Sequence, residues 1–293
     1  MLHLLLASIA IPGQGLFHLF TGAFAANRPN GDILTLTHDL TSDTVFLRRT
    51  NLGPVTLKVD TVERFEINGV EGNDTLTVGS LIGSGVSSIR FSGGSGNDFL
   101  DARDNGRATM NIFGDFGNDN LLAGNQSDTM EGGAGSDNLF GNNGNDVLLG
   151  VNSGDFVNPG RGEIDTLIGG AARDRFVLGD RAGGRARVFY DDGNNDFDGG
   201  NDIRTGMDGV SDFAHIVDFV SGLDIIQLVG APNEYVIRDL DPRGPLSRGT
   251  VAQDVGIFRP RPNLFAPDEL IAIVQDVGSG TLNLNNRNQF VFV

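Results

Sequence analysis

Along the middle of the chain, apolar residues recur singly between longer polar stretches, with a period of nine residues. Residues 93–101 read GGSGNDFLD, and residues 132–140 read GGAGSDNLF. In both, six turn-forming residues precede three residues of extended character, and the second of those three is apolar. Copies follow one another without a gap from residue 114 to residue 149. Internal repeats of this kind predict a solenoid in which each copy contacts its neighbours.

Two positions of the repeat keep their character through nine copies, which a flexible polar loop would have no reason to do. The sixth position is Asp and the eighth is apolar. The sixth positions are Asp74, Asp98, Asp119, Asp128, Asp137, Asp146, Asp155, Asp165 and Asp174. The eighth positions are Leu76, Leu100, Leu121, Met130, Leu139, Leu148, Val157, Leu167 and Phe176.

The repeat has a simple physical interpretation. Glycine supplies the positive φ angles of a tight turn, and the last three residues form a short strand whose middle side chain points inward. Phe99, next to Leu100, should therefore point outward. Two units complete one coil, so the strands stack in two parallel sheets and bury a core that no single copy could form. The predicted fold class is all-β, a parallel β-roll or β-helix solenoid.

The length of a coil decides which aspartates stack on one another. Coils of 18 residues in the regular part, and of 21 and 24 residues before it, predict two columns at the edges of the roll. The first column contains Asp74, Asp98, Asp119, Asp137, Asp155 and Asp174, and the second contains Asp128, Asp146 and Asp165.

The regular period is lost on both sides of the repeats. Alternating segments predict strands at 33–37, 44–47, 55–59 and 64–67, and longer coil sides at 87–91 and 109–113. After residue 177, strands are expected at 216–219, 225–229, 235–237, 270–274 and 290–293, and a short helix at 267–270. The predicted organisation is an apolar leader at 1–30, irregular β-helix coils at 31–113, a nonapeptide β-roll at 114–180 and a β-rich cap at 181–293.

The net charge of the chain limits the classes of partner that it can bind. The chain of 293 residues carries 38 acidic and 21 basic side chains, a net charge of −17. Such a field repels nucleic acid and attracts metal cations. There is no cysteine to form disulfides. Residues 2–11 and the A-x-A pattern at 23–25 resemble a secretory signal, but no basic residue precedes the run, so its role stays open. No apolar stretch long enough for a transmembrane helix follows it.

The stacked aspartates call for a cation. Carboxylates at strand spacing, about 4.8 Å, repel each other by a few kcal/mol per pair at an effective dielectric of about 20. A cation placed between them turns this electrostatic repulsion into attraction. Carboxylates and turn carbonyls together favour Ca²⁺, which accepts six to eight oxygen ligands in loose geometry. Zn²⁺ prefers His and Cys, which these units lack.

The pattern G-G-x-G-x-D-x-U-x, matched fully by GGSGNDFLD and GGAGSDNLF, resembles the RTX (haemolysin-type) calcium-binding repeat over residues 69–177. The resemblance implies a parallel β-roll with several Ca²⁺ ions between turns of successive coils. It also implies an extracellular protein exported through a type I secretion system. Residues 215–228 and the C-terminal FVFV look like the end of such proteins, which carries the secretion signal. With the aspartates, the implied metal sites include the turn glycines Gly93, Gly96, Gly114, Gly117, Gly132, Gly135, Gly141 and Gly144.

Departures from the motif predict weaker sites. The turns before Asp128, Asp165 and Asp174 lack one or more of the glycines. The strongest sites are expected where the turns are most regular, beside Asp98, Asp119, Asp137 and Asp146.

Other interpretations stay open. The aspartates could form only solvated Asx turns, although two unneutralised columns argue against this. Residues 194–199 resemble the start of an EF-hand loop, but its twelfth position is Thr205 rather than Glu. H-E-x-x-H and G-x-S-x-G are absent, so a calcium-binding, non-enzymatic secreted protein is favoured. A polysaccharide lyase or epimerase on a β-helix, and an adhesin or matrix component that binds polysaccharide or cell surfaces, are the alternatives.

Overall fold

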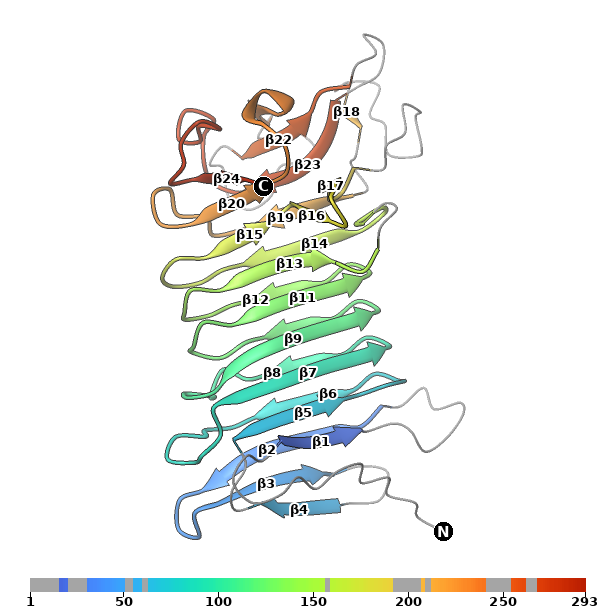
Figure 1. Ribbon diagram of the computed structural model, residues 1–293, viewed down its shortest axis with the longest axis vertical. Helices are drawn as coiled ribbons and strands as arrows, with labels where there is room; N and C mark the ends of the chain where they lie inside the picture. The colour runs from blue at the N-terminus through green and yellow to red at the C-terminus, as the bar shows by residue number, and fades with distance from the viewer. Residues whose placement is uncertain are drawn as a thin grey trace.

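The computed structural model describes residues 16–20, 31–50, 55–59, 63–155, 159–191, 207–208, 212–240, 254–261 and 268–293. Over these residues the chain forms an elongated roll that rises coil by coil from its N-terminal to its C-terminal end (Figure 1). Apart from the 3₁₀ turn η1 (Pro232–Glu234), its regular structure is β-strand. The predicted fold class, a parallel β-roll with β-rich ends, is confirmed.

Each coil contributes one strand to each of two sheets. The first sheet is parallel throughout, in the order β1 (Leu16–Phe20), β5 (Arg64–Asn68), β7 (Ser88–Ser95), β9 (Thr109–Phe116), β11 (Thr129–Ala134), β13 (Val147–Val151), β15 (Arg175–Val177), β20 (Ile225–Leu228) and β24 (Phe290–Phe292). The second has a parallel centre, in the order β19 (Phe213–Ile216), β14 (Ile164–Ile168), β12 (Asn138–Phe140), β10 (Asn120–Leu122), β8 (Phe99–Asp101), β6 (Thr75–Val78) and β2 (Ile33–Asp39).

Antiparallel strands close both ends of the second sheet. At the N-terminal end, β3 (Thr44–Arg49) and β4 (Val55–Val59) follow β2. At the C-terminal end, β23 (Asp268–Val274) pairs with β19 and continues into β22 (Val255–Arg259) and β21 (Val236–Asp239), and β18 (Met207–Asp208) also pairs with β23. The helix expected at 267–270 is wrong from residue 268 onward, because the apolar run Leu270–Val274 is buried within a sheet.

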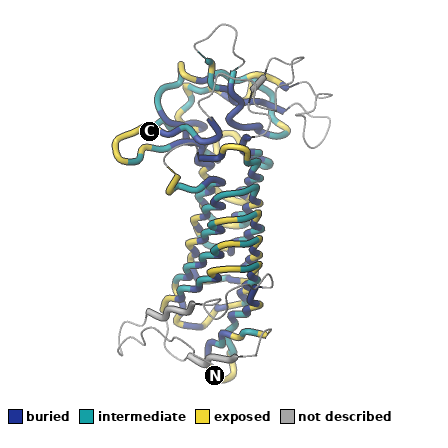
Figure 2. Tube along the Cα trace, turned by 90° about the vertical axis from the view of Figure 1, so that its right-hand side faces the viewer, coloured by how far each residue is buried: buried dark blue, intermediate teal, exposed yellow. Residues whose placement is uncertain are grey.

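The eighth positions of the repeats form the core. Leu100 on β8 lies between Leu76 and Leu121 of the neighbouring strands, and all three are fully buried. Every other eighth-position side chain that the structure describes is buried as well, whereas Val157 lies outside the described residues. Phe99 points outward as expected and is 36% exposed. Figure 2 shows this alternation of buried and exposed positions along the column.

Replacing one of these core residues should therefore cost much more than replacing an outward aromatic. Leu121→Ala is expected to lower the free energy of unfolding by about 2–5 kcal/mol, because it leaves a cavity between two stacked leucines. Phe116→Ala, at a side chain that is 60% exposed, should change it by only about 0.5 kcal/mol. Urea denaturation in saturating calcium measures both. Equal losses would contradict the assignment of the core.

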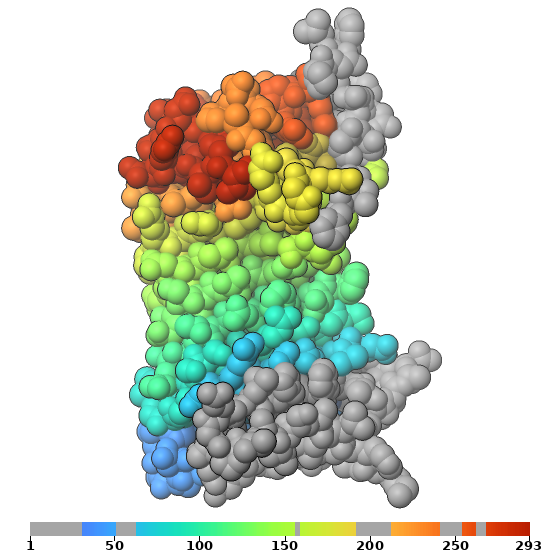
Figure 3. All heavy atoms as spheres, in the orientation of Figure 1, coloured from blue at the N-terminus to red at the C-terminus, as the bar shows by residue number. Residues whose placement is uncertain are grey.

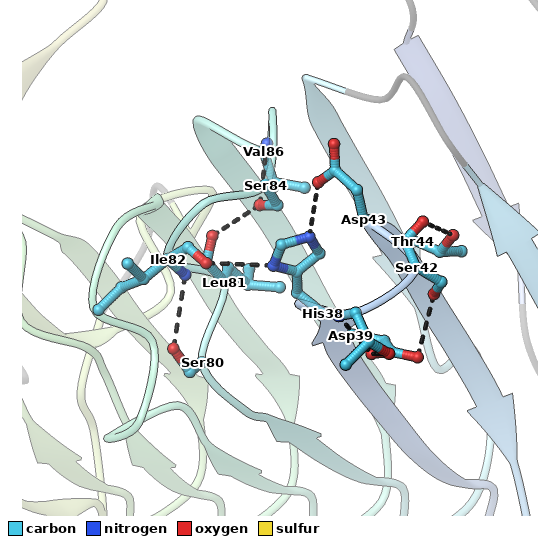
Figure 4. Close-up of polar contacts among 11 residues, drawn as sticks. His38, Asp39, Ser42, Asp43, Thr44, Ser80, Leu81, Ile82, Ser84 and Val86 are labelled. Atoms are coloured by element: carbon cyan, nitrogen blue, oxygen red, sulfur yellow. Dashed lines mark hydrogen bonds and ion pairs between the residues drawn. The ribbon is translucent and has the colours of Figure 1, made fainter.

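A histidine ties the first hairpin to the roll. Nδ1 of His38 lies 3.1 Å from the Ile82 carbonyl oxygen, and Nε2 lies 3.1 Å from Oδ1 of Asp43 (Figure 4). Both partners are acceptors, so the ring makes both contacts only when both nitrogens carry a hydrogen. The hydroxyl of Ser84 donates to the Leu81 carbonyl at 2.7 Å and holds the same loop. These contacts join the β2–β3 turn to the connection between β6 and β7.

Two excursions interrupt the regular winding in the upper half of the roll. A long connection separates β13 from β14, and the structure describes its residues 152–155 and 159–163. After β15, the antiparallel hairpin of β16 (Gly179–Ala182) and β17 (Arg185–Val188) lies on the outer surface, below the C-terminal strands (Figure 3). Arg187 of this hairpin donates to the carbonyls of Ser153 and Asp155 at 2.7 and 2.8 Å. The hairpin therefore packs against the long connection.

Candidate metal centre

The repeat aspartates form two hydrogen-bonded ladders along the roll. In each ladder, the backbone N–H of one aspartate donates to Oδ1 of the aspartate one coil further on. The distance from the N–H of Asp119 to Oδ1 of Asp137 is 2.7 Å, and the same contact recurs on the opposite edge from Asp128 to Asp146. The first ladder contains Asp32, Asp74, Asp98, Asp119, Asp137 and Asp165, and the second contains Asp128, Asp146, Asp174 and Asp224.

This arrangement corrects the predicted columns at their upper end. Asp165 belongs to the first ladder and Asp174 to the second, which is the reverse of the prediction. Asp155 belongs to neither ladder, because it lies exposed in the connection between β13 and β14. The step from Asp137 to Asp165 is 28 residues, whereas the step from Asp119 to Asp137 is 18. Ten extra residues in one connection therefore displace every later aspartate.

Two ladder residues were missed in the sequence. Asp32 follows Gly31, and Asp224 lies two residues after Gly222. Each precedes a buried apolar residue by two positions, Leu34 and Ile226 respectively. This Asp-x-apolar pair is the signal of the repeat, but the turns before it do not fit the six-residue motif. The ladders therefore extend beyond the regular repeats at both ends.

The residue before each aspartate forms a parallel contact outside the ladder. The side-chain oxygen of Asn73 accepts the backbone N–H of Asn97, and Asn97 accepts that of Asn118, both at 2.9 Å. Asn118 accepts the N–H of Ser136 at 2.9 Å. The fifth position thus bonds in the opposite direction along the chain from the sixth, so each pair of turns is held by two side chains.

The second carboxylate oxygen of most ladder aspartates has no hydrogen-bond donor. A buried acceptor without a donor is costly and rare. Within the described part of the chain, this applies to Oδ2 of Asp32, Asp74, Asp98, Asp119, Asp137, Asp146 and Asp174. The recurrence of the same orphaned atom on successive coils points to a missing positive partner.

The first glycine of each turn leaves room for this oxygen. A Cβ added to Gly114 would lie 2.2 Å from Oδ2 of Asp119 and 2.3 Å from the carbonyl oxygen of Gly132. Gly93, Gly132 and Gly141 repeat the arrangement with Asp98, Asp137 and Asp146. At each turn a carboxylate oxygen and a carbonyl oxygen of the next coil therefore face the same small space.

The fourth glycine of each turn is needed for its backbone conformation. Gly96, Gly117, Gly135 and Gly144 have φ angles of 131°, 127°, 125° and 132°, which side chains rarely adopt. A Cβ on Gly117 would also lie 1.9 Å from the Gly96 carbonyl oxygen. The glycines of the motif thus let successive turns stack closely enough to bring their oxygens together.

Burial makes these carboxylates hard to ionise without a cation. It raises the pKa of Asp137 to about 9 and that of Asp146 to about 8, although a backbone N–H bond opposes the change in each case. Neighbouring ladder carboxylates add to the rise. Burial also raises the pKa of Asp74 and Asp119 to about 7, and that of Asp98, Asp128, Asp165 and Asp174 to about 6.

The donor set fits a hard cation. Among the described residues, no group of three or more His, Cys, Asp or Glu side chains is placed to hold a metal. The ladder instead offers one carboxylate per turn together with backbone carbonyls, the oxygen ligands that Ca²⁺ accepts in flexible geometry. A cation bound there would neutralise the charges that burial disfavours. Oδ2 of Asp98, Asp119, Asp137 and Asp146, with the carbonyl oxygens beside their turn glycines, would hold it.

Stacked glycine turns with two buried carboxylate ladders define a cation-binding parallel β-roll. A family model of the RTX calcium-binding nonapeptide repeat matches four copies in the chain, over residues 90–105 and 112–150. The chain therefore carries RTX calcium-binding repeats and is a calcium-binding repeat protein. No curated protein matches it.

Within the described ranges, no helix has the length and apolar character needed to cross a membrane. The EF-hand-like segment at 194–205 lies outside the described residues.

Proposed function

We propose that this is a secreted, non-enzymatic protein whose roll folds when several Ca²⁺ ions bind between its stacked turns. The observation that carries the proposal is the series of buried, unpartnered Oδ2 atoms on successive coils. Export through a type I system to the extracellular space is part of this proposal, and the RTX repeats, which are typical of secreted proteins, support it. The C-terminal strands would cap the roll and contain the export signal.

Calcium would act by binding only the folded chain. In the unfolded chain the aspartates are far apart and solvated, whereas in the roll they are stacked and buried. With dissociation constants typical of extracellular sites, each ion at about 1 mM calcium stabilises the fold by about 0.4–1.4 kcal/mol. Several sites must therefore act together, and the folding transition should be steep in calcium concentration.

The proposal is tested by calcium removal. At neutral pH in excess chelator, the far-UV circular dichroism of the parallel sheets should be lost, and millimolar calcium should restore it. Isothermal titration calorimetry should show several ions bound per chain. An unchanged spectrum in chelator, together with no heat of calcium binding, would reject the proposal.

A matched pair of variants tests whether the ladders hold the ions. Asp146→Asn removes the charge of an unpartnered ladder carboxylate and should raise the calcium midpoint of folding several-fold. Asp155→Asn changes an exposed residue outside both ladders and should leave the midpoint unchanged. Identical midpoints in the two variants would show that the ladder carboxylates do not hold the calcium ions.

One cavity favours a second candidate function, the binding or cleavage of an acidic polysaccharide. A cavity of about 580 Å³ beside the β13–β14 connection is lined by residues that include Phe116, Asp155, Arg161 and Glu163. Burial raises the pKa of Glu163 to about 7, which suits proton transfer near neutral pH. Release of unsaturated uronates from alginate or pectate, lost in Glu163→Gln, would establish a lyase. Binding without turnover would indicate an adhesin or matrix component.

A further inference from the structure

The first ladder ends at Asp165. β14 pairs with β19 in a register that places Ala214 opposite Asp165, at the position where every earlier coil of this ladder supplies an aspartate. Asp165 therefore has no ladder aspartate opposite it on the next coil. Something other than a further rung must complete its environment.

A tyrosine occupies this place. The chain leaves the roll through the β16–β17 hairpin and returns at Tyr190, which is fully buried. Its hydroxyl donates to Oδ2 of Asp165 at 2.6 Å. Tyr190 has a φ angle of 61°, and its N–H donates to the Pro159 carbonyl at 2.8 Å. The backbone thus holds an uncommon conformation for a bulky residue, which places the hydroxyl over the end of the ladder.

Comparison of two turns shows what the hydroxyl replaces. A Cβ on Gly114 would meet Oδ2 of Asp119 and the carbonyl oxygen of Gly132, at 2.2 and 2.3 Å. A Cβ on Gly150 would meet Oδ2 of Asp165 and the hydroxyl oxygen of Tyr190, both at 2.3 Å. A hydrogen-bond donor thus stands at the Asp165 turn where a second acceptor stands at the Asp119 turn. At the Asp119 turn no protein donor reaches Oδ2, and a cation would supply the missing positive partner.

Both terminal aspartates of the second ladder are completed by protein donors as well. Oδ2 of Asp128 accepts the N–H of Gly124 at 3.0 Å, and Oδ2 of Asp224 accepts the N–H of Val220 at 2.7 Å. Between these ends, Asp146 and Asp174 keep an unpartnered oxygen. In both ladders an internal donor thus marks a rung at which the series of orphaned oxygens stops.

We propose that the Tyr190 hydroxyl takes the place of a cation at Asp165, so that calcium binding along the first ladder ends at Asp137. The inference rests on the proposed calcium function and adds the limit of the binding series. A neutral donor satisfies the buried oxygen without adding a charge. In the folded roll, the last rung of the first ladder is then completed by the chain itself rather than by an ion.

Two charge-neutralising variants in the full chain test the proposal. Asp137→Asn should bind one calcium ion fewer than the unchanged protein by isothermal titration calorimetry. Asp165→Asn keeps a side-chain oxygen for the same backbone contact and should bind the same number of ions as the unchanged protein. Loss of one ion in both variants would overturn the role of Tyr190 and leave the proposed function standing. An unchanged protein that binds no calcium would overturn both.

Removal of the hydroxyl gives an independent test. Tyr190→Phe leaves Oδ2 of Asp165 without its hydrogen-bond donor, as Oδ2 is at the rungs below it. This variant should therefore bind one ion more than the unchanged protein. Tyr235→Phe is the control, because the Tyr235 hydroxyl donates to the Val229 carbonyl and contacts no ladder residue. A count that does not rise in Tyr190→Phe overturns the proposal. Should Tyr190→Phe fail to fold, the Asp137 and Asp165 variants decide the question.

Discussion

In calcium-free buffer, acidification from about pH 9 to about pH 4 is expected to fold the roll that calcium folds at neutral pH. The reason is the raised pKa of the ladder carboxyls, about 7 for Asp119, about 8 for Asp146 and about 9 for Asp137 against 3.8 for an ordinary Asp. Below the ordinary value both states are protonated, so the fold pays no ionisation cost. Stability falls as the pH rises through the folded-state values, because the unfolded chain has already released its protons.

The size of this effect follows from linkage. A tenfold difference in proton affinity between folded and unfolded states corresponds to about 1.4 kcal/mol for each group. Even a fraction of the shift at each rung therefore adds up, over both ladders, to the whole stability of an ordinary domain, about 5–15 kcal/mol. Protons and calcium are thus expected to be alternative means of neutralising the same buried oxygens.

Far-UV circular dichroism as a function of pH measures this, once without calcium and once at millimolar calcium. Buffer stripped of calcium is preferable to a chelator, since carboxylate chelators are themselves protonated in acid. The calcium-free curve should lose its β signal on the alkaline side, and calcium should move that loss to higher pH. A calcium-free roll that is stable at neutral pH and unfolds in acid would contradict the buried, cation-dependent ladder.

A single methyl group at the first glycine of a turn is expected to disrupt the roll. The Cβ of Gly114→Ala would lie 2.2 Å from Oδ2 of Asp119 and 2.3 Å from the Gly132 carbonyl. Real Cβ contacts are essentially never below 3.0 Å, and one of these oxygens belongs to backbone that stacking holds in place. Either the two coils separate or the carboxylate leaves the ladder, and both outcomes cost calcium affinity as well as packing.

We expect Gly114→Ala to lower the free energy of unfolding by about 3 kcal/mol in saturating calcium, and to lose at least one bound ion. Gly280→Ala is the control, because a Cβ there would meet nothing within 4 Å; its effect should stay within about 0.5 kcal/mol. Urea denaturation and calcium titration measure the two quantities. Equal stability of the two variants would show that the turn can accommodate a Cβ at residue 114, contrary to the contacts in the structure.

Much of the roll could be predicted from sequence because its physical rule is local. A turn of six residues and a strand of three fix both the edge position of Asp98 and the inward direction of Leu100, without reference to any distant segment. Stacking then repeats the same environment. The coil sides at 87–91 and 109–113 were predictable for a similar reason, since strands β7 and β9 alternate with a period of two.

The errors arise where one coil differs in length from its neighbours. Asp155 keeps the nine-residue spacing after Asp146, although its turn has Ser153 in place of the fourth glycine and Pro159 is an extra residue before the next copy. The strand pairing shows the register that the fold adopts. Leu167 pairs with Leu139, so the strand at 164–168, rather than the segment that follows Asp155, lies next to β12. Tyr190 could not be found from sequence, because its partner lies 25 residues away across a hairpin.

Antiparallel strands stand at both ends of the second sheet, whereas the first sheet is parallel up to its end strands β1 and β24. A parallel stack leaves an open edge at each end, where it could in principle grow by accepting another chain. Here β3 and β4 reverse direction below, and β22 and β21 reverse direction above. Between these ends the coils are nearly interchangeable units, each adding about 4.8 Å of height. The length of the roll can therefore change by whole coils while the strands at its two ends stay the same.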